Sequence, residues 1–509
     1  MNSSFYRDKW STLKRRPPDQ GELGRLARQI AYSFLDYYLK DCRYEEDYID
    51  LLCEMTTFSQ DPQLDSPGAQ ALFGIIVETL CDDFEELQTD TYNRVMAQVI
   101  SYCRKIPAGK DLDRTLKGFQ IHSSEHLLER IKKVRANDNP MSADKSARKI
   151  LLLSRVTVGA DVAITSIIIQ RLAKIFSDAE LVVIGDRKMG EVYGGNPRIR
   201  IREVAYFKKG GLLPRLSIWH QVLQIIKEET ASCPLEKTVL VDPDSRLSQL
   251  GILPLIPLDY YFFFDSRSDT SFDSNMSMAE LTNSWLDKLL GKESFCYPKV
   301  WLPPAYLATA EPLCEEIRQH GAHRIIAVNF GVGGNPRKRV GRPLEEKLLL
   351  TLLQEPNTVI LLDKGFGDEE HTYTDALLEE INRQGYPVSH RLFRSQNNEQ
   401  IAWGVVGVQT KMGEIAALIA NSDEYIGYDS ACQHIAAALE TPCLTIFAGS
   451  NNMRFIRRWS AYGRKSCHIV HVDTLTDPAS IDVNDIITRI AHVRGTYANL
   501  PPGPFPRAR

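Results

Sequence analysis

From residue 149 onward, short apolar runs alternate with amphipathic helical segments, and this alternation restricts the fold more than any other feature. The runs are rich in Val, Ile and Leu along their whole length, as strands buried on both faces of a parallel sheet are. Such runs, separated by helices, predict βαβ units and a doubly wound α/β fold. We expect strands at Lys149–Val156, Glu180–Asp186, Ile199–Ala205, Thr238–Asp242, Tyr260–Phe264, Arg324–Asn329, Thr358–Asp363, Pro387–Phe393, Glu424–Ile426, Cys443–Phe447 and His468–Val472.

These runs form two series, so we expect two α/β domains rather than one. The stretch between them contains Pro298, Pro303 and Pro304, which suit an interdomain hinge. We place the first domain at residues 149–305 and the second at residues 322–495. Ligands of doubly wound sheets bind beyond the carboxyl ends of the strands. With two such domains facing each other, the cleft between them is the expected site.

The first 135 residues have a different pattern, in which apolar residues recur at steps of three and four and strand-like runs are absent. We therefore expect an all-α N-terminal domain over residues 1–135, followed by a polar linker over residues 136–148. The end of the chain, residues 496–509, is Pro-rich and is expected to be a tail. The predicted helices include Glu22–Lys40, Tyr44–Thr57, Ala69–Leu87, Thr91–Arg104 and Ser123–Val134.

Composition excludes several classes of protein. The 509 residues suggest about three domains. The 61 basic and 65 acidic residues give a formal charge of −4, so nothing indicates a nucleic-acid partner. No run of about 18 apolar residues occurs, and the ten cysteines form no C-x-x-C pair, which argues against a membrane span and a zinc ribbon. We expect a cytoplasmic protein with at most peripheral contact to the inner membrane.

The strongest local signal is Asp429-Ser-Ala-Cys-Gln-His434, where a predicted strand runs directly into a helix. Asp429 or Ser430 can cap that helix. The free backbone N–H groups and the positive end of the helix dipole are then available for a phosphate. From the pattern alone, a plain capped helix with His434 in the interior is an equal alternative.

A second candidate is Asp161, which follows the first predicted strand of the first α/β domain. A carboxylate at this edge of the sheet can act as a general base on an acceptor hydroxyl. Taken alone, Asp161 is better explained as the residue that caps the next helix.

The turn after strand Arg324–Asn329 combines Gly331, Gly333 and Gly334 with Arg337-Lys-Arg339, a pattern that suits a diphosphate. As a dinucleotide fingerprint the turn is weak, because Pro336 and the basic run replace its third glycine and helix start. A nicotinamide-dependent enzyme remains an alternative.

The triplet Asp242-Pro-Asp244 is of a kind that holds a metal in some transferases. Such triplets also arise often by chance, and the proline indicates a turn. We therefore expect no metal site here.

Taken together, these turns resemble glycosyltransferase family 9, the heptosyltransferases of lipopolysaccharide core synthesis in bacteria. The resemblance extends over about residues 149–495. It is carried by Lys149-Ile-Leu-Leu-Leu-Ser-Arg155 with Asp161-Val-Ala-Ile-Thr165, by Lys338-Arg339, by Asp429 to His434, and by Thr441-Pro442 with Phe447 to Ser450. Two glycines of the family pattern are replaced, by Ala160 and Ala431. The helical N-terminal domain has no counterpart in the compact members of the family.

The resemblance implies a GT-B fold, in which two Rossmann-like domains face a cleft, and an inverting, metal-independent sugar transfer. It implies that Asp161 is the base and that Lys338, with Arg339 beside it, contacts the donor phosphates and sugar. Asp429 is then expected to touch sugar hydroxyls. The backbone at Ser430 and Ala431, with His434 nearby, is expected to face the diphosphate.

We therefore expect an inverting glycosyltransferase that takes a sugar from a nucleotide-sugar donor, with an ADP-heptose-like donor favoured and no cofactor. The acceptor is a lipopolysaccharide-type molecule, another glycan or a protein. The N-terminal helices offer a surface for a homo-oligomer. The alternative from another class is a catalytically silent sugar-nucleotide-binding or scaffold protein.

Overall fold

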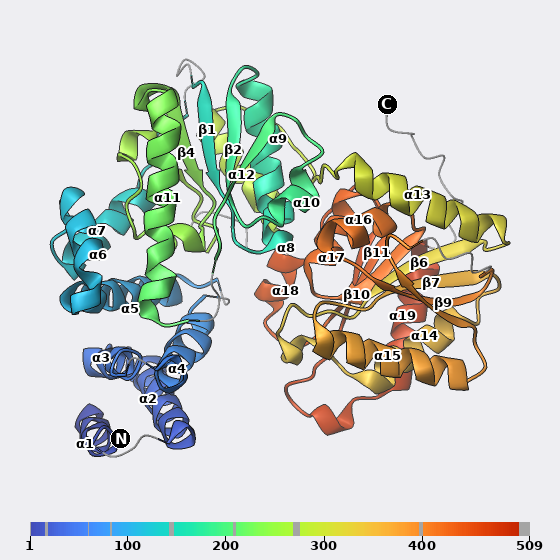
Figure 1. The fold of residues 1–509 in the computed structure, drawn as a ribbon, viewed down its shortest axis with the longest axis horizontal. Helices are drawn as coiled ribbons and strands as arrows, with labels where there is room; N and C mark the ends of the chain where they lie inside the picture. Colours follow the sequence, from blue (N-terminus) through green and yellow to red (C-terminus); the bar gives the residue numbers. More distant parts are fainter. Residues whose placement is uncertain are drawn as a thin grey trace.

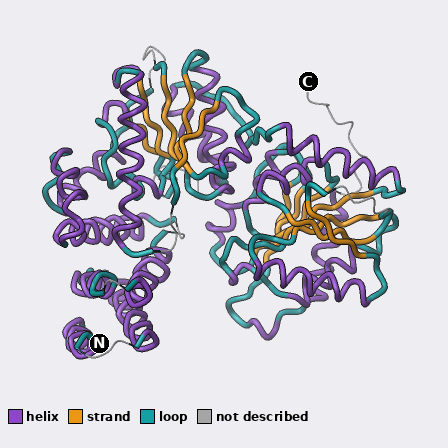
Figure 2. Tube along the Cα trace, viewed as in Figure 1, coloured by secondary structure: helices purple, strands orange, loops and turns teal. Residues whose placement is uncertain are grey.

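The computed structural model describes residues 2–15, 19–59, 61–81, 84–141, 147–206, 210–267, 275–395 and 401–497. Three parts follow one another along the chain: a helical region, a first α/β domain and a second α/β domain (Figure 1). Figure 2 shows that the strands are confined to the last two parts. Most of the predicted tail, and residues 142–146 of the predicted linker, lie outside the described residues.

The helical region confirms the all-α prediction for the described residues before the first sheet. Its α-helices are α1 (Ser3–Leu13), α2 (Gln20–Asp41), α3 (Glu46–Met55), α4 (Pro62–Ala71), α5 (Glu86–Lys105), α6 (Lys110–Gly118) and α7 (Ser124–Arg135), with a π-helical stretch at Leu72–Val77. Helix α2 shows why these boundaries form. The Asp19 carboxylate accepts the backbone N–H of Glu22 at its start, and Cys42 takes a left-handed conformation at its end.

The first α/β domain is a five-stranded parallel sheet in the order β3-β2-β1-β4-β5. Its strands are β1 (Lys149–Leu153), β2 (Glu180–Gly185), β3 (Ile199–Glu203), β4 (Thr238–Asp242) and β5 (Tyr261–Phe263). Its α-helices are α8 (Val158–Ala160), α9 (Ser166–Ile175), α10 (Met189–Tyr193), α11 (Leu212–Ser232) and α12 (Met278–Leu290). Chain order reverses beside β1, so the turn after β1 lies at the edge where such sheets bind ligands.

The second α/β domain is a seven-stranded parallel sheet in the order β12-β11-β10-β6-β7-β9-β8. Its strands are β6 (Arg324–Asn329), β7 (Thr358–Asp363), β8 (Val388–Leu392), β9 (Gly404–Gln409), β10 (Glu424–Tyr428), β11 (Cys443–Phe447) and β12 (Cys467–His471). Its α-helices are α13 (Pro304–Gln319), α14 (Arg342–Leu352), α15 (Asp368–Arg383), α16 (Met412–Ala420), α17 (Ala431–Ala438), α18 (Met453–Trp459) and α19 (Val483–Tyr497).

Two of three hydrophobic cores connect the parts. One joins the helical region to α11 and to one face of the first sheet, for example through Leu151. A second begins on the opposite face, at Ile150, and continues into the second sheet at Ile325 and helix α17. The third fills the remaining face of the second sheet under α14, α15 and α19. The two α/β domains therefore share buried apolar contact.

This architecture confirms the predicted fold class, two doubly wound parallel α/β domains preceded by a helical region, as in a GT-B protein. In the described part of the chain, every helix is too short or too polar to cross a membrane.

Candidate functional site

Asp161 lies inside a helix and does not cap one. Helix α8 begins at Val158, and Thr157 occupies its N-cap position without a side-chain cap bond. Asp161 has helical dihedrals, φ −64° and ψ −41°, and starts a π-helical turn that leads into α9. The capping alternative for Asp161 was therefore wrong, because the helix starts three residues earlier than the sequence pattern indicates.

The Asp161 carboxylate is fully buried and points back to the end of β1. Its Oδ1 accepts the backbone N–H of Arg155 at 2.8 Å and the hydroxyl of Thr165 at 2.7 Å. Its Oδ2 accepts the hydroxyl of Ser154 at 2.7 Å. Burial raises the pKa of Asp161 to about 6, although these hydrogen bonds act in the opposite direction. The group thus has a pKa near that of an effective general base.

The turn after β10 also differs in detail from the prediction. Ser430 occupies the N-cap position of α17 with extended dihedrals, but its side chain makes no cap bond. The Asp429 carboxylate accepts side-chain donors and caps no backbone N–H of the first turn either. The prediction that either side chain caps α17 was wrong, and the first backbone N–H groups of the helix are not taken by a capping side chain.

Asp429 instead joins the two predicted halves of the donor site. Its Oδ2 accepts Nζ of Lys338 at 2.5 Å, and its Oδ1 accepts Nε2 of Gln433 at 2.6 Å. Gln433 is fixed in turn, since its Oε1 accepts the hydroxyl of Thr445 at 3.1 Å. A lysine from the β6 turn and a carboxylate from the β10 turn therefore meet at the carboxyl edge of the second sheet.

His434 lies one residue further into α17 and is buried. Burial lowers its pKa to about 4; Asp429 opposes this shift and Lys338 adds to it. Its ring packs edge-on against Trp459 at a centroid distance of 6.2 Å. His434 is therefore neutral near pH 7 and can offer a hydrogen bond but no charge.

Arg339 is directed into its own domain. It donates to the carbonyl oxygen of Phe330 at 2.7 Å, lies 3.3 Å from Glu345 and stacks over the ring of Tyr373 at 4.2 Å. The structure thus places Arg339 beside Lys338 in sequence but gives it contacts that hold the turn in place.

The glycine turn does not lead into a helix as a dinucleotide fingerprint does. Gly333 and Gly334 have φ of 62° and 84°, and Pro336–Lys338 forms a 3-10 turn. Helix α14 begins only at Arg342. This weakens the nicotinamide alternative.

The two α/β domains touch where the candidate base and the donor turn come closest. A Cβ placed on Gly159 would lie 3.1 Å from both Cα of Ala431 and Cδ2 of His434. The Arg155 guanidinium lies 5.9 Å from the ring centre of Trp459. Figure 1 shows α8 of the first domain facing α17 of the second. All predicted site residues except Arg339 thus lie along this contact or the adjoining Lys338–Asp429 pair.

The carboxylates of the triplet Asp242-Pro-Asp244 are engaged in contacts with neighbouring side chains. Asp242 accepts the hydroxyls of Ser248 at 2.5 Å and Tyr261 at 2.6 Å, and Asp244 pairs with Arg267. Within the described ranges, no group of three or more His, Cys, Asp or Glu side chains is arranged to hold a metal ion.

Two residues of the candidate site, Gln433 and Trp459, were not predicted from the sequence. Gln433 lies in the first turn of α17, four residues after Asp429, so this local contact was open to prediction. Trp459 comes from α18 and reaches His434 and Arg155 only through the tertiary fold.

Comparison with known proteins gives one family match. Residues 388–477 match the model of glycosyltransferase family 9 (heptosyltransferase). This segment runs from β8 past β12 and includes the turn Asp429 to His434. The resemblance expected from the sequence is confirmed for this segment. A search of curated proteins finds no match.

Several solved structures are similar at low identity. A family 9 glycosyltransferase from Veillonella parvula has 15% identity and a TM-score of 0.48, covering 68% of this chain and 97% of its own. ADP-heptose lipopolysaccharide heptosyltransferase II from E. coli has 14% identity and a TM-score of 0.44, covering 68% and 99%. A dodecameric iron-containing heptosyltransferase complexed with ADP-D-beta-D-heptose has 11% identity and a TM-score of 0.32, covering 67% and 66%.

Proposed function

We propose that this protein is an inverting glycosyltransferase that takes a sugar from a nucleotide-sugar donor. The observation that carries the proposal is the meeting of α8 with the N-terminal end of α17. One side supplies a buried carboxylate and the other a turn that lies within the segment matching glycosyltransferase family 9. An inverting transfer needs these two elements on opposite sides of the anomeric carbon.

On the donor side, Lys338 and the first N–H groups of α17 neutralise the diphosphate. The ammonium group is held at the turn by Asp429 before the donor arrives. As the bond between the anomeric carbon and the diphosphate breaks, negative charge grows on the leaving oxygen. A cation and a helix N-terminus at fixed positions stabilise that charge without having to reorganise. Asp429 is left to accept sugar hydroxyls.

On the acceptor side, Asp161 takes the proton. The acceptor hydroxyl oxygen forms the new bond to the anomeric carbon, its proton passes to the Asp161 carboxylate, and the nucleoside diphosphate leaves. Asp161 is enclosed while Gly159 touches α17, so the acceptor enters after that contact opens. We propose that the chain between α12 and α13, which connects the two α/β domains, is the hinge of such an opening.

The donor is a nucleoside diphosphate sugar, with an ADP-heptose-like molecule favoured, and the acceptor is a glycan, a lipopolysaccharide-type molecule or a protein. The transfer uses no metal, consistent with the protein contacts that already occupy Asp242 and Asp244. We place the protein in the cytoplasm, at most peripheral to the inner membrane.

One observation favours a second function. The Asp161 carboxylate has three protein donors and no exposed surface, as a purely structural aspartate has. The alternative is therefore a protein that binds a sugar nucleotide and transfers nothing.

A thermal-shift screen against ADP-, GDP-, UDP- and dTDP-sugars tests donor binding. A donor present well above its dissociation constant raises the stability of the fold by a few kcal/mol. We expect one nucleotide class to raise the melting temperature, and the same compound to lose its sugar when an acceptor is added. Stabilisation without turnover supports the silent binder, and no stabilisation by any nucleotide sugar contradicts both.

A further inference from the structure

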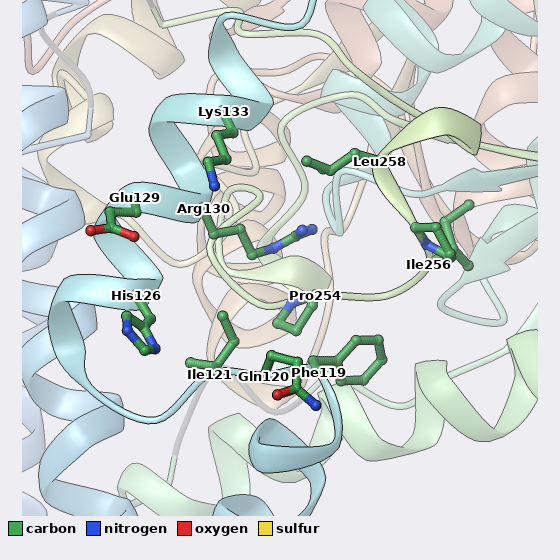
Figure 3. Close-up of a pocket in the computed structure, with 11 residues that line it drawn as sticks. Phe119, Gln120, Ile121, His126, Glu129, Arg130, Lys133, Pro254, Ile256 and Leu258 are labelled. Carbon is green, nitrogen blue, oxygen red and sulfur yellow. The ribbon is translucent and has the colours of Figure 1, made fainter.

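A cavity of about 410 Å³ lies outside the candidate transfer site, between the helical region and the first α/β domain. Helix α7 and the loop before it form one wall, and residues 254–258 form the other (Figure 3). The volume falls within the range of small-molecule sites, about 300 to 1,000 Å³.

Arg130 is the unusual residue of this cavity. Its Nε and Nη2 atoms are buried and have no hydrogen-bond partner among the described residues. The guanidinium lies over the ring of Tyr261, 5.4 Å from the ring centre, while the Tyr261 hydroxyl donates to Asp242. Buried N–H groups without an acceptor are costly, and an anion that accepts from the same guanidinium group offsets part of this cost. Burial lowers the pKa of Arg130, while Tyr261 and the carboxylate of Asp242 act in the opposite direction.

The charges around Arg130 favour an anion. Lys133, one helical turn further along α7, also lines the cavity, and His126 lies one turn before. Glu129 is the acidic member of the lining, but Figure 3 shows its carboxylate pointing away from the Arg130 guanidinium. The cationic side chains of Arg130 and Lys133 therefore line the same cavity.

The rest of the wall is largely apolar. Phe119 and Ile121 come from the loop before α7, and Pro254, Ile256 and Leu258 come from the opposite side. A small hydrated ion would leave these apolar side chains in contact with water. An apolar group attached to the anion would bury them, which is favourable.

We propose that this cavity binds a small amphiphilic anion, whose phosphate or carboxylate group pairs with Arg130 and Lys133 and whose apolar body lies against Phe119, Ile121 and Leu258. Such a ligand joins α7 to the 254–258 loop and thereby ties the helical region to the first α/β domain. The proposal does not depend on sugar transfer, because none of these residues belongs to the candidate transfer site.

Octyl phosphate is a suitable probe, and calorimetric titration of the full chain is the measurement. Inorganic phosphate has the same charge without the chain, and octyl glucoside has the same chain without the charge. We expect octyl phosphate to bind at least about tenfold more tightly than either, since both parts of the cavity contribute. Equal binding of inorganic phosphate or of octyl glucoside overturns the proposal.

Variants of α7 locate the site. Arg130→Gln and Lys133→Gln are each expected to weaken octyl phosphate binding about tenfold or more, because each removes a charge-assisted hydrogen bond. The matched control is Lys132→Gln, which alters an exposed lysine on the same helix that does not line the cavity. Undiminished binding in both charge variants overturns the proposal.

Two further variants guard against misfolding and against binding elsewhere. If Arg130→Gln does not fold, the proposal is tested with Lys133→Gln and with Leu258→Trp, which fills the cavity. Both substitutions are expected to lower the affinity for octyl phosphate. Lys338→Met, which alters the candidate donor site, is expected to leave octyl phosphate binding unchanged. Loss of binding in Lys338→Met, or retention in Leu258→Trp, contradicts the assignment. The assignment is also contradicted if the protein binds anionic phosphatidylglycerol vesicles but not octyl phosphate. That result would indicate that the ligand is a membrane surface.

Discussion

Among single residues, Asp161 determines how activity should depend on pH. Burial raises its pKa to about 6, and a general base acts only when deprotonated. We therefore expect kcat/KM to fall about tenfold for each pH unit below 6 and to level off above about 7. His434 does not produce this inflection, because burial lowers its pKa to about 4 and keeps it neutral. A flat initial-rate profile from pH 5 to 8 would argue against Asp161 as the base.

Lys338 is the residue through which donor binding can be tested. Its Nζ lies 2.5 Å from Asp429 at the α17 turn, where the diphosphate is proposed to bind. Lys338→Met removes one charge-assisted contact, so we expect the donor Kd to rise about ten- to hundredfold. Lys347→Met, on the exposed face of α14, serves as the control and should bind as the wild type does. Calorimetric titration with the stabilising nucleotide sugar measures the Kd of each variant and of the wild type. Equal affinities of Lys338→Met and the wild type would contradict the role of Lys338.

At the scale of elements, the contact between α8 and α17 makes Gly159 a sensitive position. A Cβ there would lie 3.1 Å from two atoms of α17, closer than an ordinary contact. Gly159→Ala is expected to displace α8 from α17, to destabilise the fold by about 1 to 3 kcal/mol, and to speed amide hydrogen exchange at the start of α17. Gly190→Ala in α10 is the control, because its Cβ meets only Ile201, at 3.9 Å. Unchanged exchange in Gly159→Ala would mean that the helices are not in contact in solution.

The sequence predicted the strands well and the turns less well. Four strands, among them β4 and β6, have the predicted bounds, because apolar runs buried on both faces are distinct from their surroundings. Strand β9 was missed because glycines interrupt it. At Gly407 a Cβ would lie 2.4 Å from Leu378, so close packing of α15 requires the glycine that hid the strand. Helix α1 was also missed, although Tyr6 and Trp10 stand at helical spacing and are buried.

The candidate site could be predicted only in part. Lys338 and Asp429 were both expected at the donor site, and the structure pairs them because β6 and β10 are neighbours in the sheet. The start of α8 at Val158 could not be read from the sequence, because a π-helical turn follows it and shifts Asp161 into the helix. The contact of Trp459 with His434 depends on tertiary packing for which a single sequence has no local signal.

For the whole molecule, the shared core predicts that the last helices of the N-terminal region and the first α/β domain unfold together. Ile131 of α7 is buried and lies against Gly251, in the same core as Trp219 of α11. Ile131→Ala is expected to destabilise both segments by about 2 to 4 kcal/mol. Hydrogen exchange in increasing denaturant should show α7 and α11 losing protection at the same concentration. Loss of protection in α7 alone would show that the helical region is an independent unit.

The central claim is that a transferase site lies where the two α/β domains meet, with Asp161 as its base and the α17 turn as its donor side. The most direct measurement compares sugar transfer by the wild type and by Asp161→Asn with one nucleotide sugar that stabilises both. The substitution keeps the size of the side chain and removes its basicity. We predict that donor affinity stays within about twofold while the rate of transfer falls about a hundredfold or more. Full transfer by Asp161→Asn would contradict the proposed mechanism.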